Sequence, residues 1–235
     1  MNESEVLRTL RQLSNPANVA GMARFGISPK NNLGITIVTL RTYAQKIGTD
    51  HSLAIQLWKS RIHDARLLAS MIDDPEQVTE RQMDTWAQEF DSWDICDQCC
   101  NNLFQKTPFA HKKAHEWSTQ EKEFVKRAGF TLIAVLAVHD KKATDGQFLT
   151  FFPRIKKGAT DNRNYVKKAV NWALRQIGKR NPSLHEKALK LAYGLKQIDS
   201  PAARWIAADA IRELASEKIR HSLKAKMKKT KKEKK

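Results

Sequence analysis

The sequence is poor in the signals of strands and of membrane spans. It holds 9 glycines in 235 residues, and no Asn-Gly or Asp-Gly pair joins two alternating apolar runs, so hairpin signals are nearly absent. The longest apolar stretch, TLIAVLAV at 131–138, is far too short to cross a bilayer. We therefore expect an all-α protein that does not insert into a membrane.

Export signals and a disulfide pattern are missing as well. The first residues, MNESEVLRTLRQLSN, lack the apolar centre of a signal peptide. The chain has 3 cysteines, and an odd number without an export signal favours a reducing compartment. These features predict a soluble cytoplasmic protein.

Acidic residues are scarce relative to basic ones. The chain has 42 Lys+Arg against 25 Asp+Glu, a formal net charge of +17. The segment KAKMKKTKKEKK at 224–235 supplies +7 of it, so the rest of the chain is still +10. A basic body favours a polyanionic partner, most often nucleic acid.

The lysine-rich end allows two interpretations that are compatible with each other. It reads as a solvated, disordered appendage, and it also can strengthen DNA binding through counterion release. We predict one domain over residues 1–220, followed by a basic tail at 221–235.

Helix start signals recur along the chain. Asn15-Pro16 and Ser200-Pro201 each pair an N-cap residue with proline at the first helical position. Ser118 and Glu121 have capping-box spacing. Asp50 and Asp161 precede amphipathic stretches. Together with apolar residues spaced three and four apart, they predict about eleven to thirteen helices with short links.

Helix pairs of about 35 to 45 residues have the period of HEAT or armadillo repeats. Stacked pairs build a superhelix with a long concave surface, and a basic concave surface suits a DNA duplex. An irregular all-α bundle remains the alternative, because the same periodicity allows it.

One stretch, SWDICDQCC at 92–100, offers two kinds of chemistry. Cys96, Cys99, His111 and His115 are spaced almost as in a C2H2 zinc finger. The cysteines, however, lie in a sequence that predicts a helix where a finger needs a hairpin. We therefore expect no metal and no cofactor, with the cysteines buried as small apolar residues and the histidines as an exposed helical pair.

At about 100° per residue, Trp93 and Asp97 lie on the border between the buried and the solvent faces of this helix. Asp94 and Gln98 fall on the solvent side. Asp94 suits the first turn of a helix, which Asp91 or Ser92 can cap. Asp97 lies beyond that turn and lacks such an explanation.

Two further residues resemble functional positions. Arg127, in EFVKRAGFTLI, begins a long apolar helix, where a charge needs a partner or an anion. Trp172 is flanked by Lys167, Lys168 and Arg175, a texture typical of nucleic-acid surfaces. Each also has a structural interpretation, as half of an ion pair and as a core anchor.

The motifs SWDICD, FVKRAGF and VKKAVNWALRQIGKRNP resemble those of the bacterial DNA alkylation repair family, the AlkD-like DNA glycosylases, from about residue 5 to 220. The resemblance implies a HEAT-like superhelix with a basic concave DNA surface. It also implies a monomer located with the bacterial nucleoid, acting on double-stranded DNA that contains alkylated bases.

The family excises purines alkylated at N3 or N7, which are cationic. By resemblance, Trp93 and Trp172 face the lesion nucleotide, Asp97 is the catalytic carboxylate, and Arg127 contacts the DNA backbone. At Arg24 and Phe25 some relatives have a tyrosine, which leaves lesion choice open. The cations that we expect to bind DNA are Arg24, Lys157, Arg163, Lys167, Lys168 and Arg175.

Three functions therefore stay under consideration. The first is a monofunctional alkylpurine DNA glycosylase of base excision repair, in which Asp97 stabilises an oxocarbenium-like deoxyribose. The second is a non-catalytic HEAT-like protein that binds DNA of unusual structure. The third is a helical scaffold for protein partners, which the charge disfavours.

Overall fold

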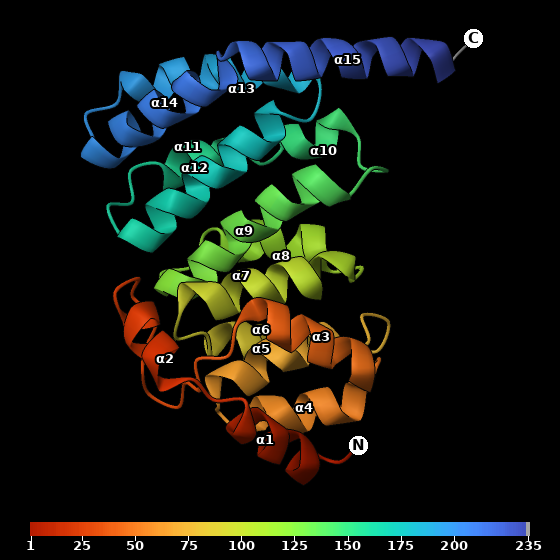
Figure 1. Cartoon of the computed structure of the whole chain (residues 1–235). Coiled ribbons are helices and arrows are strands. Elements are labelled where there is room, and N and C mark those ends of the chain that lie inside the picture. Colours follow the sequence, from red (N-terminus) through yellow and green to blue (C-terminus); the bar gives the residue numbers. More distant parts are fainter. Residues whose placement is uncertain (234–235) are drawn as a thin grey trace. The chain divides into compact units, whose positions relative to one another are not determined.

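The computed structural model describes residues 1–233, without the side chains of residues 227–233. Within this range the chain forms fifteen α-helices and one short 3-10 helix, and it forms no strand (Figure 1). The all-α prediction is therefore confirmed for the described residues. The helices outnumber the prediction because α10 and α11 are short, at 5 and 7 residues.

Two compact units make up the chain, Met1–Ala110 and His111–Lys235. We call them the N-terminal and C-terminal units. The N-terminal unit contains α1 (Glu3–Gln12), α2 (Pro16–Ala23), α3 (Ile37–Ile47), α4 (His51–Lys59), α5 (His63–Ile72), α6 (Glu80–Gln88), α7 (Trp93–Asn102) and η1 (Phe104–Lys106). The sequence had predicted only one boundary, at residue 220.

The C-terminal unit begins within α8 and continues to the end of the chain. Its helices are α8 (Ala110–Trp117), α9 (Glu123–His139), α10 (Asp145–Leu149), α11 (Phe152–Gly158), α12 (Asn164–Gly178), α13 (Pro182–Lys196), α14 (Pro201–Leu214) and α15 (Glu217–Glu233). Charge differs sharply between the units. The N-terminal unit has 11 Lys+Arg and 13 Asp+Glu, whereas the C-terminal unit has 31 and 12.

One nearly buried helix lies at the centre of each unit. In α5 the buried residues run almost without a break from His63 to Ile72, and α5 packs against both α4 and α7. In the C-terminal unit, α9 is buried from Arg127 to Ala137 and packs along α12. A helix that is buried on nearly all sides is typical of the interior of a helical protein.

Three of the predicted helix starts are confirmed. The side chains of Asn15, Asp50 and Ser200 each accept a hydrogen bond from the backbone N–H three residues on. The capping box at Ser118 is wrong, because its hydroxyl donates to His115 O at the end of α8 and α9 begins only after Lys122. The Asp161 start is wrong for a similar reason: Arg163 is the N-cap of α12.

Most of the lysine-rich end lies within the last described helix. Residues 217–233 form α15, a stretch without glycine or proline in which lysine, a good helix former, predominates. Leu223 is buried, and Lys226 Nζ donates to Lys179 O at 2.7 Å. Residues 234–235 of the predicted tail lie outside the described residues.

Candidate active site

Helix α7 carries Trp93 and Asp97 one turn apart. Trp93 is the first residue of the helix, and the four-residue spacing puts both side chains on one face. Both are partly exposed, while the neighbouring Ile95 and Cys96 are buried. The expected border position of this pair is therefore confirmed.

The three cysteines lie on the inner side of α7. Cys96, Cys99 and Cys100 are free and fully buried, and burial raises the pKa of the Cys99 thiol well above its usual value. The prediction that they are core residues is confirmed. Among residues 1–233, no group of three or more His, Cys, Asp or Glu side chains is arranged to hold a metal ion.

The interpretation of Asp94 is wrong. This side chain was expected to face solvent, but it is buried at 8% exposure, and its carboxylate accepts from His63 Nε2 at 2.8 Å. Ser92 does not cap the helix with its side chain, because its hydroxyl donates to Asp94 Oδ1. Asp94 therefore joins the first turn of α7 to the start of α5.

The ion pair makes a pH-dependent contribution to stability. Burial by itself lowers the pKa of His63, but the hydrogen bond and charge of Asp94 outweigh it and raise that pKa. Burial raises the pKa of Asp94, and His63 and Ser92 outweigh this effect and lower it. Each partner is thus charged over a wider pH range than in the unfolded chain.

We expect Asp94→Asn to lower the free energy of unfolding by about 2–4 kcal/mol near pH 5.5, since it leaves a buried imidazolium unpaired. The difference from wild type narrows as pH falls toward the lowered pKa of Asp94, which lies below the usual value of about 4, and as pH rises toward the raised pKa of His63, which lies above the usual value of about 6.5. Urea unfolding at a series of pH values measures it. A difference that is constant from pH 3.5 to pH 8 contradicts this account.

A loop that follows α2 is tied to α5 and α7. Trp93 Nε1 donates to Phe25 O at 3.0 Å, and the Asp64 carboxylate accepts from Leu33 N at 2.6 Å and from Ile35 N at 2.9 Å. The bond from Trp93 Nε1 orients the indole and holds the backbone of Phe25, the residue after Arg24 at the end of α2, against Trp93. The Phe25 ring is 73% exposed.

Arg127 lies in the second turn of α9 and is 6% exposed. Its Nη1 donates to Tyr165 O at 2.7 Å, which joins α9 to the first turn of α12. The expectation that this charge needs a partner is confirmed, and a backbone carbonyl is one such partner.

Trp172 lies on α12, four residues after Lys168 and three before Arg175. It is partly exposed and Lys168 is exposed, whereas the opposite side of the helix, with Val170, is core. Lys167 lies over the ring of Trp205 on α14, with Nζ 4.9 Å from the ring centroid. Sequence reasoning missed this 41% exposed tryptophan.

The six cations that were expected to bind DNA fall into two groups. Arg24, Lys157 and Lys168 are exposed, whereas Lys167 is partly exposed and lies over Trp205. Arg163 and Arg175 instead have carboxylate partners, which the sequence did not reveal. A phosphate that binds either of these two arginines has to compete with an ion pair.

Both ion pairs are well defined. Asp161 accepts from Arg163 Nη2 at 2.6 Å and from Lys126 Nζ at 3.1 Å, and the bond from Arg163 is the main reason that the pKa of Asp161 falls to about 2. Arg175 pairs with Glu213, which also accepts from Lys179.

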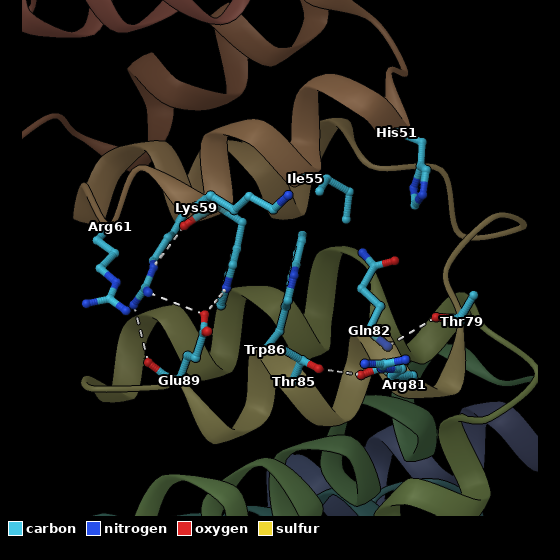
Figure 2. Close-up of a pocket in the computed structure, with 12 residues that line it drawn as sticks. His51, Ile55, Lys59, Arg61, Thr79, Arg81, Gln82, Thr85, Trp86 and Glu89 are labelled. Carbon is cyan, nitrogen blue, oxygen red and sulfur yellow. Dashed lines mark hydrogen bonds and ion pairs between the residues drawn. The ribbon is translucent and has the colours of Figure 1, made fainter.

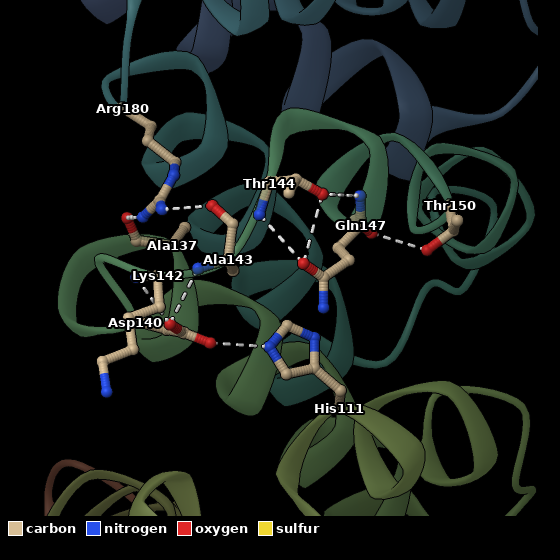
Figure 3. A network of polar contacts seen from close by, with 9 residues as sticks. All are labelled: His111, Ala137, Asp140, Lys142, Ala143, Thr144, Gln147, Thr150 and Arg180. Carbon is tan, nitrogen blue, oxygen red and sulfur yellow. Dashed lines mark hydrogen bonds and ion pairs between the residues drawn. The ribbon is translucent and has the colours of Figure 1, made fainter.

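The histidine pair on α8 is not exposed as expected. His111 Nε2 bonds to Asp140 Oδ2 at 2.9 Å (Figure 3). His115 Nε2 bonds to Thr150 Oγ1 at 3.1 Å. The His115 ring stacks on Phe151 with centroids 4.3 Å apart. Both rings are therefore occupied in packing α8 against other parts of the C-terminal unit.

A pocket between α4 and α6 was also missed. Its volume is about 470 Å³, and its wall contains Trp58 and Trp86, stacked with centroids 3.9 Å apart. Figure 2 shows Arg61 and Arg81 at opposite ends of it. The sequence signal that could have indicated the pocket is a pair of tryptophans, Trp58 and Trp86, each on a helix with basic residues nearby. No residue of α7 lines this pocket.

No helix of residues 1–233 is both long enough and apolar enough to cross a membrane.

Comparison with known proteins gives three results. The family model for DNA alkylation repair enzymes matches residues 6–227. An uncharacterized protein of Listeria innocua serovar 6a, Lin0241, is 23% identical over 193 residues, covering 80% of this chain and 84% of that protein. A solved structure, from a new family of proteins related to the HEAT-like repeat DNA glycosylases with affinity for branched DNA structures, superposes with a TM-score of 0.76. It is 20% identical and covers 91% of this chain and 95% of that one. The HEAT-like repeat fold predicted from the sequence is confirmed.

Proposed function

This chain belongs to the DNA alkylation repair enzyme family, and we propose that it is a DNA glycosylase that excises cationic N3- or N7-alkylated purines from duplex DNA. The observation that carries the proposal is the pair on α7. The carboxylate of Asp97 and the indole of Trp93 lie on one face of α7. The second carboxylate of this helix, Asp94, is paired with His63 in the interior.

Asp97 supplies the main catalytic effect in this proposal. An alkylated purine already carries a positive charge, so it departs as a neutral base and needs no acid to protonate it. Positive charge builds instead on the deoxyribose, and a fixed carboxylate stabilises that charge and orients the attacking water. The reaction is hydrolysis of the N-glycosidic bond, and it consumes one water.

The tryptophans supply selectivity. An indole face attracts a cation by about 0.5–2 kcal/mol, so Trp93 and Trp172 favour an alkylated base over a neutral one. The bond from Trp93 Nε1 to Phe25 O fixes the plane of that ring before DNA binds. Preorganised contacts of this kind avoid an ordering cost on binding.

In this proposal the basic residues bind the DNA backbone. The C-terminal unit, with 31 Lys+Arg against 12 Asp+Glu, provides the attraction for phosphates. Lys157, Lys168 and Arg24 bind the backbone directly, since their side chains are exposed. Lys167, Arg163 and Arg175 contribute to the field from their partnered positions, and Arg127 holds α12 in place.

A second candidate function is binding of DNA of unusual structure without catalysis. It is favoured by the similarity in fold to a protein family with affinity for branched DNA. The presence of Trp93, Asp97, Arg127 and Trp172 together favours the glycosylase.

Incubation with randomly methylated duplex DNA, followed by chromatography of the free bases, separates the two functions. The glycosylase releases 7-methylguanine or 3-methyladenine in amounts that grow with time and protein. Tight binding of that DNA without any free base selects the second candidate and overturns the first.

A further inference from the structure

We propose that the pocket between α4 and α6 is a second DNA site, which holds the backbone phosphates of a DNA arm other than the one read by α7. The inference rests on the proposal that the chain acts on DNA. Neither candidate function requires this pocket. We assign the pocket to the binding of branched DNA substrates.

The pocket concentrates positive charge in the unit that otherwise lacks it. Although the N-terminal unit has more acidic than basic residues, four of its 11 cations line this one pocket. They are Lys59, Arg61, Arg66 and Arg81. Glu89 is the one acid among the lining residues.

Three of these cations are available to a ligand. Lys59, Arg61 and Arg81 are exposed, and within residues 1–233 none of them has a carboxylate partner among the ion pairs of the structure. Arg61 and Arg81 lie at opposite ends of the pocket, with Trp86 between them (Figure 2). Cations spaced along a groove suit successive phosphates of one strand.

The acid in the pocket already has partners, and one of them, Arg66, also lies 4.0 Å from Asp91. Glu89 Oε2 accepts from Trp58 Nε1 at 2.6 Å and lies 3.5 Å from Arg66 Nη2. Arg66 is buried and also donates to Trp58 O. This internal pair leaves the three exposed cations to set the charge that a ligand meets.

The wall between the cations also suits an anion. Trp58 and Trp86 stack on each other and are each 3% exposed, so the pair presents little apolar surface to a ligand. Thr79, Thr85 and Gln82 add polar side chains to the lining. Such a surface recognises phosphate oxygens and has no geometry for base sequence.

The test compares an immobile four-way junction with a linear duplex of the same arm sequence, using fluorescence anisotropy and the whole chain. For the triple variant Lys59→Glu, Arg61→Glu, Arg81→Glu we expect the junction Kd to rise at least about tenfold, with a salt slope shallower by about 2 to 3. The Kd for the linear duplex is expected to change by less than about threefold.

A matched control carries the same change in net charge at exposed cations on α1 and α3, namely Arg8→Glu, Arg41→Glu and Lys46→Glu. It is expected to leave the junction Kd within about threefold of wild type. The proposal is overturned if both triple variants weaken junction binding equally, or if the pocket variant leaves it unchanged. A wild type without preference for the junction overturns it too.

Base release from methylated linear duplex is measured on the same proteins. The pocket variant is expected to retain it, because no residue of the pocket belongs to α7. If the wild type releases no base, the proposed glycosylase activity is wrong, but the comparison of junction and duplex binding still tests the second DNA site. The failure of one proposal is therefore distinguishable from the failure of the other.

Discussion

Replacing Asp97 with Asn is expected to lower the rate of alkylpurine release by at least about 10²–10³-fold, the cost of removing one preorganised electrostatic group. Asn has nearly the size of Asp and keeps a hydrogen-bonding side chain, but it carries no charge to oppose the positive deoxyribose. Because Asp97 lies beyond the first turn of α7, the substitution leaves the start of the helix unchanged.

Asp91→Asn is the matched control. Asp91 is exposed, precedes α7 and lies 4.0 Å from Arg66, so Asp91→Asn removes one negative charge outside the helix. We expect its rate to stay within about threefold of wild type. DNA affinity, measured by anisotropy, is expected to be retained by both variants. Equal rates for Asp97→Asn and wild type would remove Asp97 from the mechanism.

Gly129→Ala is expected to lower the free energy of unfolding by about 3 kcal/mol or more, at the upper end of overpacking effects. Gly129 lies in α9 where this helix meets the end of α8. A Cβ there would come within 2.7 Å of Ser118 Cα and of Trp117 C, and closer still to Ser118 N. These are backbone atoms, so the two helices have to separate.

Gly194→Ala on α13 is the control, since nothing lies within 4 Å of the added Cβ. Because alanine favours the helix, we expect this variant to be more stable than wild type by about 0.4–1 kcal/mol. Urea unfolding followed by tryptophan fluorescence measures both variants. A Gly129→Ala protein as stable as wild type would mean that the close approach of α8 and α9 can relax.

The position of Gly129 clarifies what the sequence motif FVKRAGF contains. Arg127 was singled out because a charge at the head of an apolar helix is conspicuous, and the structure gives it a partner in Tyr165 O. The glycine two residues later serves helix packing, and its role depends on a close approach of another helix. Local sequence signals carry no information on which backbone lies nearby.

The all-helical fold was predictable because its signals are local. Caps such as Asn15 and Asp50 act within their own first turn, and apolar spacing reports the buried face of each helix. The border position of Trp93 and Asp97 follows from the same periodicity. Ser118 shows the limit, since its hydroxyl had two competing partners and the one at the end of α8 prevailed.

Errors at the candidate site come from partners distant in the sequence. Asp94 looked like an exposed helix-start residue, yet His63, thirty-one residues earlier, pairs with it. Arg175 looked like a DNA contact, yet Glu213 on α14 pairs with it. Neither partner has a signal near the residue concerned, so periodicity and charge could not reveal them.

The central claim is that this chain breaks the N-glycosidic bond of a cationic purine through Asp97. Its most direct test is a single-turnover reaction on an oligonucleotide duplex with one 7-methylguanine, with wild type, Asp97→Asn and Asp91→Asn at equal concentration. The account predicts free 7-methylguanine at similar rates from wild type and Asp91→Asn, and release at least about 10²-fold slower from Asp97→Asn. Release at the spontaneous rate by all three proteins, each bound to the duplex, would contradict it.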